Sequence, residues 1–137
     1  AARGTCRAVV AINPPAPDPD AVDGLQWRRS RGHEWVDGPP LADGEEGYTR
    51  LPIDALLQMA QGSLLTVSTA VTVPLLLVTS ALDEVVDPFS ADAVAAGVTV
   101  PVTRLRLERS GHVATLGPEC HLLVAAVIRF VATPATP

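Results

Sequence analysis

Two apolar segments, each followed directly by a polar loop, constrain the fold of this chain more than any other feature of its sequence. Residues 73–80 (Val-Pro-Leu-Leu-Leu-Val-Thr-Ser) form a nearly continuous apolar run, which indicates a strand buried on both faces of a parallel sheet. Residues 102–107 alternate in polarity, with arginines on one side and leucines on the other. This alternation is typical of a half-exposed strand nearer the edge of the sheet.

A third strand is predicted at the start of the chain, where residues 6–12 are mostly apolar and Asn13-Pro14-Pro15 follow. Proline rings stop the pairing of strands, so this buried parallel strand should end there. Along the chain the order is strand, long insertion, helix, strand, helix, strand, helix. This order predicts an α/β fold with three parallel strands, flanking helices and a cap-like insertion.

The insertion, residues 14–50, is rich in Pro, Gly, Asp and Arg and shows little periodicity. Such a length without clear structure usually indicates a functional loop or cap. One short helix is expected near residues 20–29. The only basic cluster, which we expect in a solvated loop, consists of Arg28, Arg29 and Arg31.

Three further helices are predicted. Residues 51–70 have an amphipathic pattern with a break at Gly62-Ser63. Ser90 is expected to cap a short helix at residues 91–96. The last helix should begin at Pro118, and its predicted buried stripe comprises Leu122, Leu123, Ala126, Val127 and Phe130.

The length of 137 residues suits one domain or part of a larger one. We divide the chain into residues 1–13 as a core strand, residues 14–70 as the cap-like insertion with its helices, and residues 71–137 as the C-terminal strands and helices. The last segment carries the candidate site.

Charge and hydropathy exclude some partners. The net charge of −5 argues against nucleic acid or an anionic membrane, since both require a basic face. Residues 55–82 contain no charged side chain and are long enough to cross a bilayer. Polar residues and a change of period inside this segment favour a buried helix followed by a buried strand, so no stable membrane insertion is expected.

The two cysteines, Cys6 and Cys120, lie far apart, and no Cys/His spacing indicates a metal site. We therefore expect no metal and no cofactor. Two small buried thiols are typical of a reducing compartment, which predicts a cytoplasmic protein.

Asp83 and His112 are the candidate catalytic residues. Asp83 follows one predicted parallel strand and His112 follows the next, and the carboxyl ends of such strands share one edge of the sheet, where ligands bind. The aspartate can accept the Nδ1–H of the imidazole, and Nε2 can then act as a general base. Taken singly, Asp83 would be interpreted as a turn residue and His112 as a loop histidine whose hydrogen bonds are satisfied; together, at the ends of successive strands, they indicate function.

Glu84 and Asp87 are rival acids. Glu84 is expected to be solvated, and Asp87, which precedes Pro88, is typical of a turn before a helix. Asp83 is preferred because it comes first after the strand. Three more polar residues are expected to be structural, with the serine shaping the turn before the base: His33, His121 and Ser110.

Residues 73–130 resemble the C-terminal half of carboxylesterases and monoacylglycerol lipases of the α/β-hydrolase fold. The resemblance is carried by residues 73–77, by Leu-Asp-Glu-Val-Val-Asp-Pro at residues 82–88, and by Ser-Gly-His-Val-Ala-Thr-Leu at residues 110–116. It implies that Asp83 is the acid of a catalytic triad and that His112 is its base.

The resemblance extends upstream. Residues 7–14 resemble the family's strand after the nucleophile helix, and residues 14–70 fall where the family carries a cap over its acyl pocket. That location leaves two roles open for Leu56, Leu57 and Met59, which could line the pocket or pack in the core. Gly117 departs from the family, which often has an acid there to cap the last helix.

The sequence contains no Gly-x-Ser-x-Gly, so this chain lacks the nucleophile elbow and its oxyanion hole. Gly62-Ser63 is the nearest approach, but no strand is predicted before it. The elbow is expected in a missing N-terminal portion, just before Ala1.

The leading hypothesis is that this chain belongs to a serine carboxylic ester hydrolase that acts on small acyl esters. The chain contributes the acid and the base, and we expect it to be inactive without the rest of the fold. One alternative is a non-catalytic remnant that self-associates through exposed strand edges. Another keeps the fold but changes the chemistry to that of a dehalogenase, an epoxide hydrolase or an acyltransferase.

Overall fold

A computed structural model describes residues 6–39, 46–65, 71–87 and 89–132. The elements follow one another in this order: β1 (Val9–Ile12), α1 (Pro19–Ser30), β2 (Trp35–Asp37), β3 (Arg50–Pro52), α2 (Ile53–Leu64), β4 (Leu75–Ser80), α3 (Ser90–Ala96), β5 (Val102–Leu107) and α4 (Cys120–Ala132). They form two compact units. One is Ala16–Thr66, and the other combines Ala1–Pro15 with Val67–Pro137.

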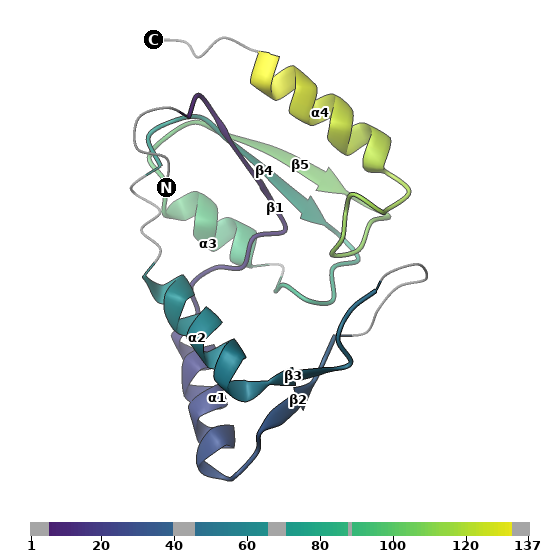
Figure 1. Cartoon of the computed structure of the whole chain (residues 1–137). Coiled ribbons are helices and arrows are strands. Elements are labelled where there is room, and N and C mark those ends of the chain that lie inside the picture. The colour runs from purple at the N-terminus through teal and green to yellow at the C-terminus, as the bar shows by residue number, and fades with distance from the viewer. Residues whose placement is uncertain (1–5, 40–45, 66–70, 88, 133–137) are drawn as a thin grey trace. The chain divides into compact units, whose positions relative to one another are not determined.

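The larger unit is built on a three-stranded sheet in the order β1-β4-β5, with both pairs parallel (Figure 1). The three predicted parallel strands are therefore confirmed. In the register of this sheet, Leu75 of β4 lies beside Val9 of β1 and Val102 of β5. At the other end Ser80 lies beside Leu107, so β4 and β5 finish together.

Helices cover both faces of the sheet, as predicted for a parallel sheet (Figure 1). On one face α4 places the buried Leu123 against Leu76, Val78 and Leu107. On the other, Ala91 of α3 packs with the leucines of β4 that point the opposite way.

The predicted buried stripe of α4 is correct for most of its members. Leu123 is buried, and Val127 and Phe130 pack partly against the same core. Leu122 is 46% exposed, and its prediction is wrong. It lies one residue, or about 100°, around the helix from Leu123, so it points in a different direction while Leu123 packs against the core.

Two strands are shorter than predicted. Residues 6–8 lie outside β1, and residues 73–74 lie outside β4. Val9 N–H donates to the Pro74 carbonyl, but Pro74 has no N–H with which to continue the ladder. In the described residues β1 also has only one neighbouring strand, so its side chains are half-buried or exposed rather than fully buried.

The smaller unit contains α1, α2 and a short antiparallel hairpin of β2 and β3. The expected helix near residues 20–29 is confirmed as α1. Asp18 caps the N-terminus of this helix, because its side chain accepts a hydrogen bond from Asp20 N–H. The hairpin was not expected, because strands of three residues leave no detectable periodicity. The chain leaves α1 through Gly32, whose φ of 82° favours glycine.

The arginine cluster lies at the end of α1 and not in a loop. Its side chains are solvated, as predicted, but they have partners. Arg29 forms an ion pair with Asp54 at 2.9 Å, and Arg31 stacks over the ring of Trp27.

Three predicted helix boundaries are wrong. Helix α2 begins at Ile53 and continues without a break through Gly62 and Ser63, because neither residue blocks the backbone hydrogen bonds of a helix. Residues 66–70, which the predicted helix included, lie outside the described residues. Ser90 lies inside α3 and makes no cap, since Asp87 already accepts from Phe89 N–H. Helix α4 begins at Cys120 and not at Pro118, because Glu119 is held beneath the preceding loop.

Two expectations from composition can be compared with the structure. No helix among the described residues is long and apolar enough to cross a membrane. Cys6 and Cys120 are free thiols, but they are half-buried rather than buried.

Candidate active site

The loop after β4 delivers Asp83 to the carboxyl edge of the sheet. Backbone hydrogen bonds hold this loop beside the end of β5, from Ala81 N–H to the Leu107 carbonyl at 2.8 Å and from Leu82 N–H to the Ser110 carbonyl at 3.2 Å. The Asp83 side chain is only 7% exposed. Its Oδ1 accepts from the N–H groups of Val85 and Val86, at 2.8 and 3.0 Å. These two bonds fix the carboxylate and leave Oδ2 available for another donor.

That donor is His112. Its Nδ1 lies 3.0 Å from Asp83 Oδ2, so the expected contact between the two residues is present. An ionised carboxylate can only accept, so the proton of this bond is on Nδ1 of the imidazole. The His112 side chain is 36% exposed, and Nε2 has no partner among the described residues. The pair therefore has the geometry of a general base whose tautomer is fixed by a carboxylate.

A buried glutamate supports the loop that carries His112. Glu119 accepts from Arg109 N–H at 2.7 Å, from Ser110 Oγ at 2.9 Å and from Glu108 N–H at 3.2 Å. The hydrogen bond from Arg109 is the main reason that the pKa of Glu119 lies below its usual value, and the bonds from Ser110 and Glu108 lower it further against the opposing effect of desolvation. Ser110 shapes the turn, as predicted.

Gly117 is explained by the same support. A Cβ at this position would lie 2.8 Å from Ser110 Oγ and 3.0 Å from Ser110 Cβ. Ser110 is fully buried and bonded to Glu119, so it cannot move aside easily. The loop therefore has no space for the acid that the resemblance in sequence led us to compare with Gly117. Glu119, two residues later, provides the carboxylate.

Asn13 joins the three strand ends. It follows β1 directly, is 5% exposed and has a φ of 45°. Its Oδ1 accepts from Ser80 N–H at 2.8 Å, and its Nδ2 donates to the His112 carbonyl at 2.8 Å. Nδ2 also lies 3.0 Å from Ser80 Oγ and 3.4 Å from the Gly111 carbonyl.

No other candidate in the described part of the chain is hydrogen-bonded to the His112 side chain. Glu84 is exposed, and Asp87 accepts from Phe89 N–H at 2.8 Å, in the turn before α3 as predicted. His121 is exposed on α4, and His33 belongs to the smaller unit. Gly62-Ser63 lies within a helix and so has no resemblance to a nucleophile elbow. Of the residues that could line a pocket, Leu57 is buried and Met59 is 66% exposed.

Two residues that support the site were missed from the sequence. Asn13 follows a strand directly, and the rule that selected Asp83 and His112 would have drawn attention to it. Glu119 was not singled out, because its role depends on a close approach to the backbone of residues 108–110 that no sequence pattern marks.

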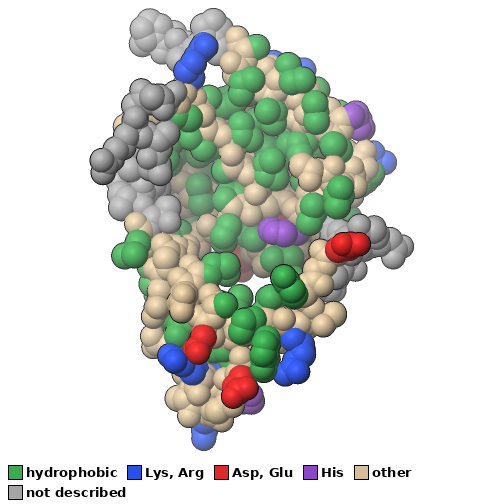
Figure 2. All heavy atoms as spheres, in the orientation of Figure 1, with side chains coloured by type: hydrophobic (Ala, Val, Ile, Leu, Met, Phe, Trp, Pro, Cys, Tyr) green, Lys and Arg blue, Asp and Glu red, His purple; other side chains and the backbone are tan. Residues whose placement is uncertain are grey.

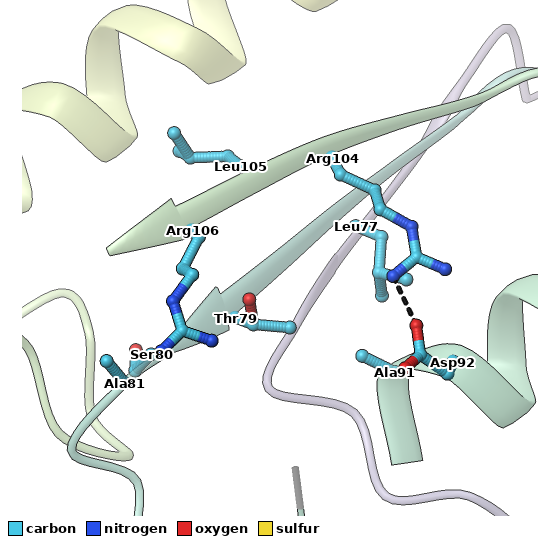
Figure 3. Close-up of a pocket in the computed structure, with 9 residues that line it drawn as sticks. All are labelled: Leu77, Thr79, Ser80, Ala81, Ala91, Asp92, Arg104, Leu105 and Arg106. Carbon is cyan, nitrogen blue, oxygen red and sulfur yellow. Dashed lines mark hydrogen bonds and ion pairs between the residues drawn. The ribbon is translucent and has the colours of Figure 1, made fainter. Parts of the chain in front are cut away.

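A cavity of about 280 Å³ lies on the α3 side of β4 and β5, and its lining includes neither Asp83 nor His112 (Figure 3). Arg104 and Arg106 project over it from β5. Each guanidinium is already paired, Arg104 with Asp92 and Arg106 with Glu108 at 3.0 Å. No cluster of three or more metal-binding side chains occurs among the described residues.

Sequence comparisons give no match to a protein-family model and none to a curated protein. Solved structures do match. A structure from work on LipS and LipT, two metagenome-derived lipolytic enzymes, is 25% identical with a TM-score of 0.70, over 91% of this chain and 54% of the other. Alpha/beta hydrolase domain-containing protein 10 from mouse is 20% identical with a TM-score of 0.66, over 90% of this chain and 51% of the other.

A third structure, E-2-(acetamidomethylene)succinate hydrolase, has a TM-score of 0.51 at 19% identity, over 93% of this chain and 58% of the other. The chain thus spans about half the length of the structures that it resembles, between 51% and 58%.

Proposed function

The chain has a partial α/β-hydrolase fold and resembles hydrolases, and we propose that it supplies the acid and the base of a serine carboxylic ester hydrolase. The observation that carries this proposal is the bond between His112 Nδ1 and Asp83 Oδ2, at 3.0 Å. Because Asp83 Oδ1 is held separately by two N–H groups, the carboxylate is fixed before any substrate arrives.

In the proposed reaction, a serine supplied by the N-terminal portion of the fold attacks the ester carbonyl. His112 Nε2 takes the hydroxyl proton as the serine oxygen forms its bond to carbon, and Asp83 stabilises the resulting imidazolium. The bond to the alcohol then breaks, and the proton passes from Nε2 to the leaving oxygen. Water repeats the sequence on the acyl-enzyme and releases the acid. The substrate class is small acyl esters, and no metal or cofactor takes part.

The partner that we propose is the N-terminal portion of an α/β-hydrolase fold, joined to this chain or separate from it. In the described residues β1 pairs with β4 alone, so the opposite edge of β1 is open to another strand. Figure 2 shows hydrophobic side chains gathered over the part of the molecule that contains the sheet and α4. Four apolar side chains of α4 are also about half exposed: Leu122, Val124, Ile128 and Val131.

The test is hydrolysis of p-nitrophenyl butyrate by a protein in which residues 1–137 are combined with an N-terminal portion containing Gly-x-Ser-x-Gly. We expect turnover that His112→Ala abolishes and that His121→Ala, a control on the exposed face of α4, leaves unchanged. The 137-residue chain alone should show no turnover, because it contains no elbow. Turnover by the chain alone that is lost in His112→Ala would contradict this division of the triad.

The same assay separates the alternative activities. A dehalogenase or an epoxide hydrolase uses an aspartate at the elbow, so activity on a halide or an epoxide would appear only when the added N-terminal portion carries aspartate in place of the elbow serine. An acyltransferase would label with a fluorophosphonate, but would pass the acyl group to an added alcohol faster than to water. A non-catalytic remnant would do none of these.

A further inference from the structure

We infer that Asn13 is a positioning residue, which holds the acid-bearing loop and the base-bearing loop in the arrangement that His112 requires. This inference rests on the proposed function, and it assigns a role to a residue whose side chain bonds to the backbone of His112 and not to its imidazole. Its basis is a buried amide whose two ends bond to two different segments. Oδ1 bonds to the end of β4, three residues before Asp83, and Nδ2 bonds to the backbone of His112 itself.

The orientation of the amide is set by its partners. Ser80 N–H can only donate, so the atom that faces it is the oxygen. The His112 carbonyl can only accept, so the atom that faces it is the nitrogen. Both halves of the amide are needed at once, and neither a carboxylate nor a hydroxyl can replace them. The sequence separation between the joined residues is 67 for Ser80 and 99 for His112.

The backbone at this position restricts the choice further. The φ of 45° lies in the left-handed region, which asparagine, aspartate and glycine adopt more readily than other residues. The N–H of Asn13 is bonded to the Val78 carbonyl at 2.9 Å, so the main chain still pairs with β4 while the side chain turns toward the His112 loop. Asparagine is the residue that satisfies both requirements.

The bond to His112 matters because Glu119 holds the loop only before the histidine, at residues 108–110. Asn13 holds the carbonyl of His112 and approaches that of Gly111, at 2.8 and 3.4 Å. Without this bond, the His112 carbonyl still accepts from Ala114 N–H at 3.0 Å, a contact within the loop itself, but the loop loses its hydrogen bond to the end of β1. The imidazole then leaves Asp83 for part of the time, because a single bond to Oδ2 must compete with water.

The experiment uses the 137-residue chain labelled with ¹⁵N-histidine. The observable is the low-field Nδ1–H resonance of His112, identified by its loss in Asp83→Asn, and its rate of exchange with water. Asn13→Asp keeps the left-handed backbone and the acceptor for Ser80 N–H, but it removes the donor to His112. We expect the resonance to broaden and its exchange to accelerate by at least about tenfold, while the amide signals of β4 and β5 persist.

Two further variants make the result decisive. Asn13→Gly retains the backbone conformation and removes both bonds, and it should reproduce the effect. Ser80→Ala removes only a hydroxyl that Asn13 Nδ2 also contacts, and it should leave the His112 resonance unchanged. An unaltered His112 signal in a folded Asn13→Asp or Asn13→Gly chain overturns the inference. So does the failure of both variants to fold while Ser80→Ala folds, because Asn13 would then serve the fold as a whole.

In the assembled esterase, Asn13→Asp should lower kcat for p-nitrophenyl butyrate at least about tenfold with little change in KM, because the variant alters the base and not substrate binding. The proposed ester hydrolysis and the positioning role of Asn13 can be disproved independently of each other. If the assembled protein hydrolyses no ester but Asn13→Asp still alters the His112 resonance, the proposed function is wrong and the positioning role stands. If hydrolysis depends on His112 but not on Asn13, only this inference is wrong.

Discussion

Asp83 Oδ2 and His112 Nδ1 lie 3.0 Å apart, although 29 residues separate them in the chain. The contact follows from the register of the sheet. Ser80, the last residue of β4, lies beside Leu107, the last residue of β5, so the two loops leave the same edge at neighbouring points. Two hydrogen bonds then keep the β4 loop beside the β5 loop.

If the proposed function is correct, this contact predicts the effect of Asp83→Asn on ester hydrolysis by the chain combined with an N-terminal portion that carries the elbow. An asparagine can accept from Val85 and Val86 as Asp83 does, but its amide nitrogen then faces Nδ1 and favours the wrong imidazole tautomer. We expect kcat to fall by about four orders of magnitude with little change in stability. The control is Asp87→Asn, which keeps an acceptor for Phe89 N–H and should retain nearly full activity. Equal losses in both variants would remove Asp83 from its assigned role.

Glu119 gives a prediction about pH. Hydrogen bonds lower the pKa of this carboxyl below its ordinary value of 4.5, so its contribution to stability is fully present above that value and is lost as the pH falls through the lowered pKa. Glu119→Gln should therefore have a lower Tm than the natural chain near neutral pH, and the difference should shrink as the pH falls below about 4. Thermal unfolding followed by circular dichroism measures the Tm of Glu119→Gln and of the natural chain at each pH.

The control for this series is Glu84→Gln, because Glu84 is exposed and has no hydrogen bond that is lost on protonation among the described residues. It should show no pH-dependent difference from the natural chain. A difference for Glu119→Gln that stays constant from neutral to acidic pH would mean that packing, and not the charge, accounts for the effect.

Gly117 and Gly24 form a matched pair. Gly117→Ala places a Cβ 2.8 Å from the buried Ser110 Oγ, so we expect the free energy of unfolding to fall by about 1–3 kcal/mol. Gly24 lies within α1 with nothing within 4 Å of an added Cβ, and Gly24→Ala should stabilise its helix by about 0.5–1 kcal/mol. Urea denaturation of each variant measures the difference. A neutral Gly117→Ala would show that the loop can move away from Ser110.

The open edge of β1 predicts self-association of the isolated chain. Val9 and Asn13 direct their N–H groups to β4, so those of Val10 and Ile12 face the other edge. Ile12→Lys adds a charge beside that edge, and we expect it to lower the apparent mass in concentration-dependent light scattering. Val131→Lys, an exposed apolar site on α4, is the control. Equal effects of both changes would assign the association to general surface hydrophobicity.

Much of the sheet was predictable because its signals are local. The apolar run of β4 and the alternation of β5 each describe a strand by its own side chains, and a parallel sheet follows from their order with helices. The ends of the elements were less predictable. The start of β1 depends on Pro74, which directly precedes the neighbouring strand β4, and the start of α4 depends on the bonds that Glu119 makes to an earlier loop.

By itself, the sequence determined that an acid and a histidine follow successive parallel strands, and that no nucleophile elbow occurs within these residues. Only the tertiary structure decided that Asp83, rather than Glu84 or Asp87, reaches His112. It also revealed Asn13, whose single amide joins the ends of β1 and β4 to the loop after β5. The reason is physical: a hydrogen bond across 99 residues depends on strand register and side-chain direction to within a fraction of an ångström, and no local pattern encodes either.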